Sequence, residues 1–571
     1  MIKRTVPLLV LSLTCIQSLQ AATSLDIKGL EGALSENVNA YISAIPEGDY
    51  STSLRFRSQV QDNIINALQA LGYYEPEISF VVSEDEKSLT VNVDPGEPVK
   101  LEVVDIKLIG AAEGDPEFQK LLKSSKLKKG AVLNHGDYEL IKSGIRNLAL
   151  ARGYFDGDFA ETRLEVSPEV KQAFVHLYYD SGDRYHFGET TIEGSQIDEE
   201  RVRSLAPYES GEPYLSSKVG LFNQRMSNTD WFSSVFVKPD LEHVGKQRQL
   251  PMRVSLAPQS KNQIETGLGY STDVGVRGTL KWKKPWVNRR GHSFDSNLSL
   301  SDPEQLITFG YEIPLEDVLR DYYRIEYGMK NEENNDTDSF ESSLSLERHW
   351  VLDSGWHRTA SVRILHEDFT QGVQDDDIAM ILPGISFSRT QTSGGSMPMS
   401  GNKQTIAFEV SDKNIVSRAR LARVLGRTAW IRSAGQNHRG LARADFNANF
   451  VENIEDVPPS IRFFAGGDNT IRGYDYESIS PKDSSGKLIG AKYMVTTSLE
   501  YQYRIKGDWW AATFVDYGDA WSEDLPDGKM GTGVGVRWAS PVGPVRLDFA
   551  WGLQSDPGER FRFHFTLGPE L

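Results

Sequence analysis

Cysteine is almost absent from the sequence. The 571 residues include only one, Cys15, in an apolar stretch near the N-terminus. A single cysteine forms no internal disulfide, and this one is lost if the stretch is an export signal, so no thiolate catalysis is expected either. Stability and function therefore depend on other side chains.

Basic charge and long apolar runs are also scarce. The chain has 62 Lys and Arg against 80 Asp and Glu, a formal charge of -18, and no basic stripe of the kind that binds nucleic acid. After the N-terminus no apolar run is long enough for a transmembrane helix. The sequence is still compatible with a membrane-spanning β-barrel, because barrel strands carry their apolar residues at alternate positions.

The motifs of common hydrolases are missing as well. Neither the HExxH zinc motif nor the GxSxG nucleophile elbow occurs, and the 10 histidines are scattered. We therefore expect no enzyme activity, no catalytic residues, no metal and no cofactor. A catalytic dyad on a barrel rim, as in outer-membrane proteases and lipases, is the alternative.

The N-terminus has the pattern of a secretory signal peptide. Lys3 and Arg4 precede an apolar stretch over residues 6–16, and the small residues Ala21 and Ala22 follow. The apolar stretch is too short to span a bilayer as an anchor. We predict a signal peptide over residues 1–21 and export across the inner membrane.

The region after the signal repeats one pattern three times. An amphipathic stretch ends at Gly72-Tyr73-Tyr74 and another at Gly153-Tyr154-Phe155, and two alternating strands follow each. The pattern predicts one strand, two helices and two strands in each copy. The three domains are expected at residues 22–100, 101–184 and 185–260.

The third copy departs from the pattern, with Asp230, Trp231 and Phe232 where the others have glycine and aromatics. We expect these aromatics to form the core of that domain, with a contact to a barrel as the alternative. Exposed edges of such small sheets can accept a strand from an extended polypeptide. The three domains are therefore candidate docking sites.

The rest of the chain changes to alternating strands separated by polar turns. Val545, Leu547 and Phe549, for example, alternate with Arg546 and Asp548. An even number of such strands with aromatics near their ends is typical of an outer-membrane barrel. Sixteen strands are predicted within residues 261–571, at 262–272, 275–286, 290–301, 305–314, 321–331, 339–352, 355–367, 379–390, 403–413, 417–432, 437–452, 488–505, 508–521, 530–540, 543–554 and 560–570.

The longest connection, residues 452–487, carries Arg472-Gly473-Tyr474. In the strand after it, Glu500 lies on the polar face, and we place Asp516 of the next strand in the lumen too. A guanidinium that folds back into the lumen can bond with both carboxylates, shielded from bulk water. An ordinary surface turn is the alternative.

These motifs together carry a family resemblance. The tip Ile471-Arg472-Gly473-Tyr474, the stretch Phe514-Val515-Asp516-Tyr517-Gly518, a glycine-rich strand and an aromatic last strand resemble the Omp85 superfamily of outer-membrane assembly and secretion proteins. The layout and the last residues, 567–571, are most similar to the TamA family of translocation and assembly module subunits. The resemblance implies an α+β arm of POTRA repeats, in the periplasm of a Gram-negative bacterium, followed by an all-β, 16-stranded barrel in the outer membrane.

The resemblance also implies a function and partners. Such proteins help to insert or translocate client β-barrel and autotransporter proteins, and the loop with Arg472, Gly473 and Tyr474 plugs the barrel, its arginine contacting the wall at positions matching Glu500 and Asp516. The expected partners are a TamB-like protein anchored in the inner membrane, client proteins and outer-membrane lipid. The alternatives are a two-partner secretion transporter for one exoprotein, phospholipid transport with TamB, and a passive porin.

We expect the barrel to close at a weak seam between its first and last strands. Glycines in the first strand pack no side chain, and Pro569 near the end of the last cannot donate to a ladder. We hypothesise a lateral gate, with a permanently closed seam as the alternative. The seam residues are Gly267, Gly269, Phe563, Phe565 and Gly568.

Overall fold

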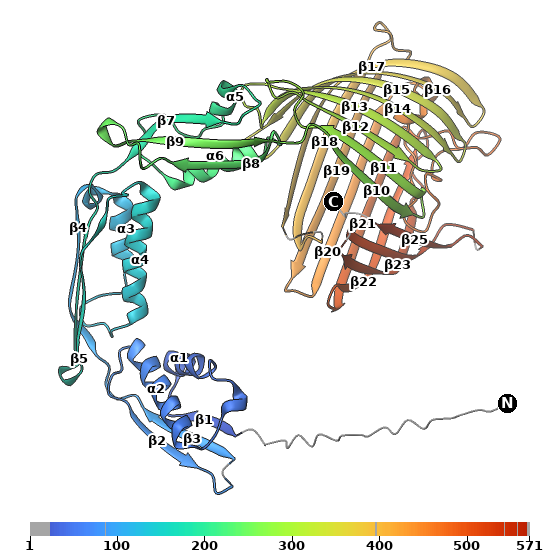
Figure 1. Cartoon of the computed structure of the whole chain (residues 1–571). Coiled ribbons are helices and arrows are strands. Elements are labelled where there is room, and N and C mark those ends of the chain that lie inside the picture. The colour runs from blue at the N-terminus through green and yellow to red at the C-terminus, as the bar shows by residue number, and fades with distance from the viewer. Residues whose placement is uncertain are drawn as a thin grey trace, which may run out of the picture. The chain divides into compact units, whose positions relative to one another are not determined.

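Figure 1 shows the computed structural model of the chain. It describes residues 23–85, 87–393, 395, 397–541, 543–556 and 558–567. The predicted signal peptide, residues 1–21, and Gly568 of the predicted seam lie outside the described residues. Within them, no helix combines the length and the apolar character needed to cross a bilayer.

The N-terminal part contains three small mixed domains (Figure 1). Each has the predicted order of one strand, two helices and two strands, with the third strand in the middle of its sheet. The elements of the first are β1 (Ser24–Lys28), α1 (Gly32–Ile42), α2 (Leu54–Ala70), β2 (Glu77–Val82) and β3 (Ser88–Asp94). Those of the second are β4 (Lys100–Ile109), α3 (Pro116–Ser124), α4 (His135–Arg152), β5 (Asp158–Ser167) and β6 (Gln172–Asp180). Those of the third are β7 (His186–Glu193), α5 (Glu199–Arg203), α6 (Ser216–Ser227), β8 (Phe232–Pro239) and β9 (Gln249–Pro258).

The first domain shows how the sequence pattern builds these units. Val60, Ile64 and Leu68 recur at helical spacing in α2 and are fully buried against Leu89 and Val91 of the central strand. The first strand pairs parallel and the second antiparallel with that central strand. Each sheet therefore keeps its first and second strands as edges.

One to three residues after the second helix, a residue has a left-handed backbone in all three domains. Gly72 has φ +93° and Gly153 has φ +82°, while Asp230 in the third domain has φ +57°. Asparagine and aspartate are the residues besides glycine that adopt this conformation most readily. The apparent break in the third copy thus preserves the backbone geometry of the repeat.

Trp231 is among the buried apolar residues, as expected, and it also makes the contact with the barrel that was the alternative. Trp231 is 3% exposed, but its indole Nε1 donates to the carbonyl of Gly291, 3.1 Å away, in the turn between the second and third barrel strands. A Cβ on Gly291 would lie 2.2 Å from the Trp231 ring. The ring is buried because a residue without a side chain lets it approach the turn.

The remaining strands close into a barrel in which each pairs antiparallel with its neighbours in sequence. The predicted count of sixteen is confirmed. The strands are β10 (Gln263–Ser271), β11 (Gly275–Lys284), β12 (Ser293–Leu300), β13 (Glu304–Pro314), β14 (Asp321–Asn334), β15 (Thr337–Val351), β16 (His357–Gln371), β17 (Gln374–Ser393), β18 (Ser400–Ser411), β19 (Leu421–Ala434), β20 (His438–Phe450), β21 (Tyr493–Lys506), β22 (Trp509–Trp521), β23 (Lys529–Ser540), β24 (Gly543–Gly552) and β25 (Phe561–Leu567).

Alternation along the strands separates the two faces of the wall. In β21, Leu499 and Tyr501 are exposed, whereas Ser498 before them and Gln502 after them are buried. The predicted start of this strand at residue 488 is too early. Leu488 and Ala491 form isolated bridges within the preceding loop instead, so the ladder to β20 begins at Tyr493.

The closure between the first and last strands is far weaker than the other pairings. Among the described residues, which end in β25 at Leu567, β10 and β25 share a single residue pair, Ser271 with Thr566. On its other side β10 pairs with β11 along its whole length, from Gln263 to Ser271. Among the described residues, one edge of β10 therefore has no neighbouring strand along most of its length.

Candidate functional site

The connection between β20 and β21, residues 451–492, folds as a body inside the barrel, and we call it the plug loop. Its first part contains the two short turns η5 (Ile454–Asp456) and η6 (Pro459–Ile461). These pack on a buried apolar patch of β16 and β17 that includes Phe369 and Met380. The plug loop thus has an apolar base on one side of the wall.

Arg462 fixes the path of the chain at this base. Its Nε donates to the carbonyl of Val457 at 2.9 Å, and its Nη1 donates to that of Ile489 at 2.8 Å. Its Nη2 reaches Gln374 Oε1 of β17 at 2.7 Å. One buried side chain therefore ties both ends of the plug loop to each other and to the wall.

Arg472 lies at the tip of the plug loop and is almost completely buried. Its Nε and Nη2 donate to the two carboxylate oxygens of Asp516, at 2.7 and 2.9 Å. Its Nη1 donates to Glu500 at 2.7 Å and to Asp548 at 3.2 Å. The structure thus brings together Arg472, Glu500 and Asp516, the three charged residues singled out in the sequence, and adds a third carboxylate.

Arg537 completes this group of buried charges, which we call the lumen charge cluster. Its guanidinium lies 2.8 Å from Glu500 and 2.7 Å from Asp548. Two guanidinium groups are therefore shared by the three carboxylates of Glu500, Asp516 and Asp548. Arg537 and Asp548 were not predicted for this site. The alternation of their strands could have indicated them, since Arg537 follows inward-facing glycines two residues apart.

Burial makes the lumen charge cluster a cooperative unit. The side chains of Arg472, Asp516 and Arg537 are 5%, 0% and 1% exposed. Because desolvating an ion is costly, each charge depends on its partners, and loss of one leaves the others buried without compensation. The ring of Phe514, centred 3.4 Å from the Arg472 guanidinium carbon, adds a cation–π contact.

Glycine in β23 makes room for the tip. A Cβ on Gly531 would lie 1.8 Å from the carbonyl oxygen of Arg472. This is less than any real contact between nonbonded atoms, so the backbone of the plug loop touches the wall where the wall has no side chain. In the glycine-rich strand noted in the sequence, Gly531 is thus the glycine that meets the plug loop.

A second set of contacts joins the tip to the last strand. The Gly473 N–H donates to Nε2 of His564 at 3.0 Å, and Arg562 lies 2.7 Å from Asp475. The Tyr474 hydroxyl donates to Gln554 at 2.9 Å, in the turn before β25. All three residues of the Arg-Gly-Tyr motif therefore contact the C-terminal part of the wall.

With this fold and site, the chain matches known protein families. The Omp85 superfamily domain matches residues 261–570, more than half of the chain. The chain belongs to the Omp85 superfamily. Residues 24–95 match the first POTRA domain of TamA, so the N-terminal repeats of this Omp85 protein are POTRA domains.

The relatives of this Omp85 chain include outer membrane protein assembly factors named BamA. The protein of Nitratidesulfovibrio vulgaris is 24% identical over 72% of this chain and 54% of the relative, so the chain spans about half the length of that protein. The protein of Neisseria meningitidis is 20% identical over 90% of this chain and 72% of its own length. The crystal structure of BamA from Haemophilus ducreyi lacking POTRA domains 1–3 has the same fold, with a TM-score of 0.71 at 16% identity, covering 82% of this chain and 99% of that one.

The predicted seam residues of the Omp85 barrel lie on the two strands that close it. Gly267 and Gly269 pair with Thr279 and Arg277 of β11, on the side away from the seam. Phe563 pairs with β24 and Phe565 contacts both sides, because its carbonyl accepts the N–H of Thr272 at 3.1 Å. The structure thus brings Phe565, but not Phe563, into the closing contact.

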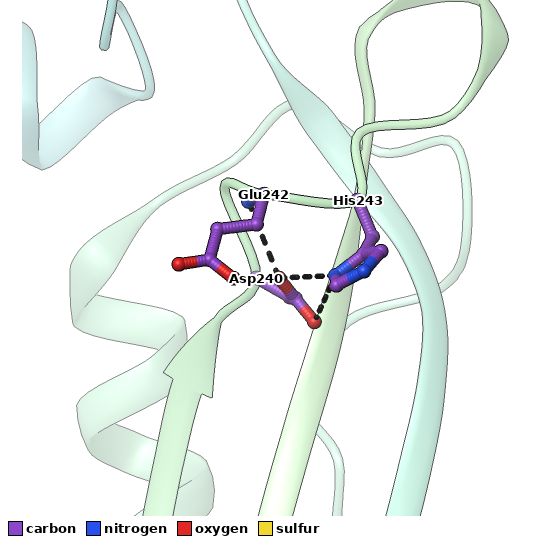
Figure 2. Close-up of side chains that lie close together, drawn as sticks. All are labelled: Asp240, Glu242 and His243. Carbon is purple, nitrogen blue, oxygen red and sulfur yellow. Dashed lines mark hydrogen bonds and ion pairs between the residues drawn. The ribbon is translucent and has the colours of Figure 1, made fainter.

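Two clusters of carboxylate and imidazole groups approach each other closely enough to share a cation, among the residues that the structure describes. In the third POTRA domain, Asp240 accepts the N–H of Glu242 at 3.2 Å and faces His243 Nδ1 at 3.1 Å (Figure 2). These contacts close a turn between β8 and β9. The other cluster, Asp273, Asp468 and His564, lies at the seam.

Proposed function

We propose that this chain is an outer-membrane protein assembly factor that helps to insert or translocate client β-barrel and autotransporter proteins. In this proposal the POTRA domains, over residues 22–100, 101–184 and 185–260, form a periplasmic arm. The barrel, residues 261–571, is plugged by the Arg-Gly-Tyr loop and opens laterally between its first and last strands. The family and the assembly-factor relatives support this function.

The observation that carries the proposal is the weak pairing on one edge of β10. The N–H and C=O groups on its edge away from β11 have one residue pair to β25, among the residues described in both strands. Leu268 and Ile264 on its outer face are 84% and 68% exposed, as suits a lipid-facing strand. An unpaired edge beside lipid is a template on which a client strand can form hydrogen bonds.

The plug favours assembly over free diffusion through the lumen. The plug loop fills the barrel with its own apolar core and with the lumen charge cluster. A porin needs an open aqueous channel instead. Gly267, Gly269, Phe563, Phe565 and Gly568 remain our candidates for the strands that part, and Arg472, Glu500 and Asp516 for the contact that holds the plug.

The arm is the proposed site for partners. Each POTRA sheet has two edge strands that can accept an extended segment of a client or of a TamB-like protein anchored in the inner membrane. Outer-membrane lipid surrounds the barrel, and nucleic acid has no role in this proposal. Export of one dedicated exoprotein, and phospholipid transport with TamB, are the competing functions.

A disulfide across the seam tests the proposal. Ser271 and Thr566 are directly opposed, so the double variant Ser271→Cys/Thr566→Cys should crosslink on oxidation. The natural Cys15 lies in the predicted signal peptide and does not interfere. We would add the mature protein in liposomes to a urea-unfolded autotransporter β-domain and follow the heat-resistant folded form on gels.

We expect the reduced variant to accelerate client folding and the oxidised variant to fall to the rate of empty liposomes. Ser271→Cys alone, treated with the same oxidant, is the matched control. Equal rates with open and crosslinked seams contradict the proposal. Movement of labelled phospholipid without any effect on the client favours the lipid function, and activity toward a single exoprotein favours secretion.

A further inference from the structure

The plug loop contacts both strands that meet at the seam, through Asp468. On one side, its Oδ1 accepts a hydrogen bond from His564 Nδ1 at 2.5 Å, and its Oδ2 accepts one from the Thr566 hydroxyl at 2.8 Å. Both partners belong to β25. A single loop carboxylate therefore holds two inward-facing residues of the last strand.

The same residue reaches the first strand from the other side of the seam. The backbone N–H of Asp468 donates to Asp273 Oδ2 at 2.7 Å, in the turn that follows β10. The hydroxyl of Thr272 lies 3.5 Å from Asp468 Oδ1, a weaker contact. Asp468 thus bridges β25 and the end of β10, which the backbone ladder joins by only one residue pair among the described residues.

The bridge lies at one end of the seam. Asp273 and Thr272 directly follow Ser271, the residue of β10 that pairs with β25. The Thr272 N–H donates to the Phe565 carbonyl, and the Phe565 N–H donates to the Thr272 hydroxyl, both at 3.1 Å. The closing contacts between described residues are therefore gathered at the turn between β10 and β11.

Burial and the neighbouring tip make this contact rigid. Asp468 and His564 are 5% and 5% exposed. Because the Gly473 N–H donates to Nε2 of His564, the ring carries its proton on Nδ1, facing Asp468. The imidazole thus links Asp468 to Gly473, the neighbour of Arg472, and so to the lumen charge cluster.

We propose that Asp468 is a latch by which the plug loop keeps the lateral seam closed, so that withdrawal of the plug and parting of the seam are coupled. The proposal rests on the proposed function for its biological meaning, since it assigns the regulation of the same seam. The loop is fixed to β25 by contacts from Asp468, Gly473 and Asp475, and to the β10 side by Asp273 and Thr272. Asp468→Ala removes the carboxylate bonds to β25 but keeps the backbone N–H that donates to Asp273, whereas Asp273→Ala removes the contact on the β10 side.

Hydrogen exchange of the full mature protein in lipid nanodiscs tests the latch without any client. We expect Asp468→Ala to speed exchange of the peptides that contain residues 271–273 and 563–567 by about tenfold or more, because their protecting contacts open more often. Asp273→Ala, on the opposite side of the seam, should have the same effect. Asp483→Ala is the matched control, since that carboxylate bonds with Ser485 and Lys487 in its own turn of the plug loop.

A second variant separates loss of the latch from misfolding. Asp468→Ala combined with the oxidised pair Ser271→Cys/Thr566→Cys should recover the protection of both peptides. Unchanged exchange in Asp468→Ala overturns the proposal, and so does loss of protection that the disulfide does not restore. Because the assay contains no client, failure of the assembly function leaves its result intact, and the reverse also holds.

Discussion

Arg472 owes its position to partners from three different strands. Asp516 of β22 binds it through two oxygens, while Glu500 of β21 and Asp548 of β24 bind one nitrogen. A planar guanidinium can satisfy this arrangement, whereas a lysine ammonium cannot reach all three carboxylates in the same plane. The contact is therefore specific for arginine, and it fixes the tip of the plug loop against the wall.

Removal of this side chain should release the tip. Arg472→Ala leaves Glu500 and Asp548 with Arg537 but takes from Asp516 its guanidinium partner, and truncating one partner of a buried charge group costs roughly 3–5 kcal/mol. We expect a lower melting temperature in detergent and rapid trypsin cleavage within the plug loop. Both are measured on the purified protein.

Exposed arginine provides the comparison. Arg420 is 75% exposed and makes one surface contact, with Asp412 at 3.4 Å. Arg420→Ala should change stability by less than about 1 kcal/mol. A plug loop that stays resistant to trypsin in Arg472→Ala would show that the apolar base alone holds it.

At the residue scale, the sequence predicts the face to which a side chain points more readily than the residues that it contacts. The inward position of Glu500 follows from alternation, because successive strand residues point to opposite faces, whereas that of Asp516 was predicted from the closure of its strand beside the previous one. This alternation does not apply to Asp468, since it lies in a loop whose path depends on Arg462 and on the bridges of residues 463 and 465. Its contacts with β25 and with Asp273 therefore could not be predicted.

At the scale of elements, one buried carboxylate joins the two helices of the second POTRA domain. Asp115 precedes α3 and accepts hydrogen bonds from Arg152 Nε at 2.7 Å and from the Tyr154 hydroxyl at 3.0 Å, at the end of α4. Burial acts to raise the pKa of Asp115, but hydrogen bonds, led by that from Arg152, lower it overall. Burial together with Asp115 raises the pKa of Tyr154 to about 12.

The stability of this domain should therefore decrease as the pH falls. Because the pKa of Asp115 is lower in the folded state, its contribution is complete above the unfolded pKa of about 4 and disappears as the pH falls through the folded value. Asp115→Ala should lose about 1–3 kcal/mol near neutral pH and progressively less below pH about 4. Hydrogen exchange of β6 as a function of urea and pH measures this.

Asp158 serves as the control for that experiment, since its side chain is 82% exposed and lies 3.6 Å from Arg146. Asp158→Ala should leave the exchange of β6 close to that of the wild type at every pH. An equal loss in Asp115→Ala at pH 7 and at pH 3 would mean that the carboxylate acts through packing and not through its charge.

Helices and strands could be predicted where a sequence pattern recurs at a regular spacing. Strand, two helices and two strands recur in each POTRA domain, and sixteen alternating strands appear in the barrel. The start of β21 was misplaced because Leu488 and Ala491 form isolated bridges within the plug loop instead of pairing with β20. The barrel contact of Trp231 was only the alternative prediction, and its partner Gly291 was not predicted because the two residues lie far apart in the sequence.

At the scale of the whole molecule, we expect the plug loop to limit conductance through the barrel. Its base packs on β16 and β17, and its tip binds β21–β25, so the loop spans the lumen. Replacing residues 455–490 by a short Gly-Ser linker should convert a barrel of low conductance into an open pore of the kind found among sixteen-stranded porins. Planar bilayer recordings measure the difference.

The same linker placed in the turn between β19 and β20, residues 435–437, is the control and should leave the conductance low. Low conductance after removal of the plug loop would mean that other segments fill the lumen. Large conductance in the intact protein would mean that the loop leaves a continuous water path.

The sequence positions of the lumen contacts have a consequence for how the protein is made. Arg472 lies 28 to 76 residues from its carboxylate partners, all in the C-terminal strands, whereas Asp468 is 195 residues from Asp273 at the seam. Short chain closures form sooner than long ones. The C-terminal sheet can therefore wrap around its loop while the nascent cylinder is still open, and the junction with the first strand is then the last step of biogenesis and the first to be reversed.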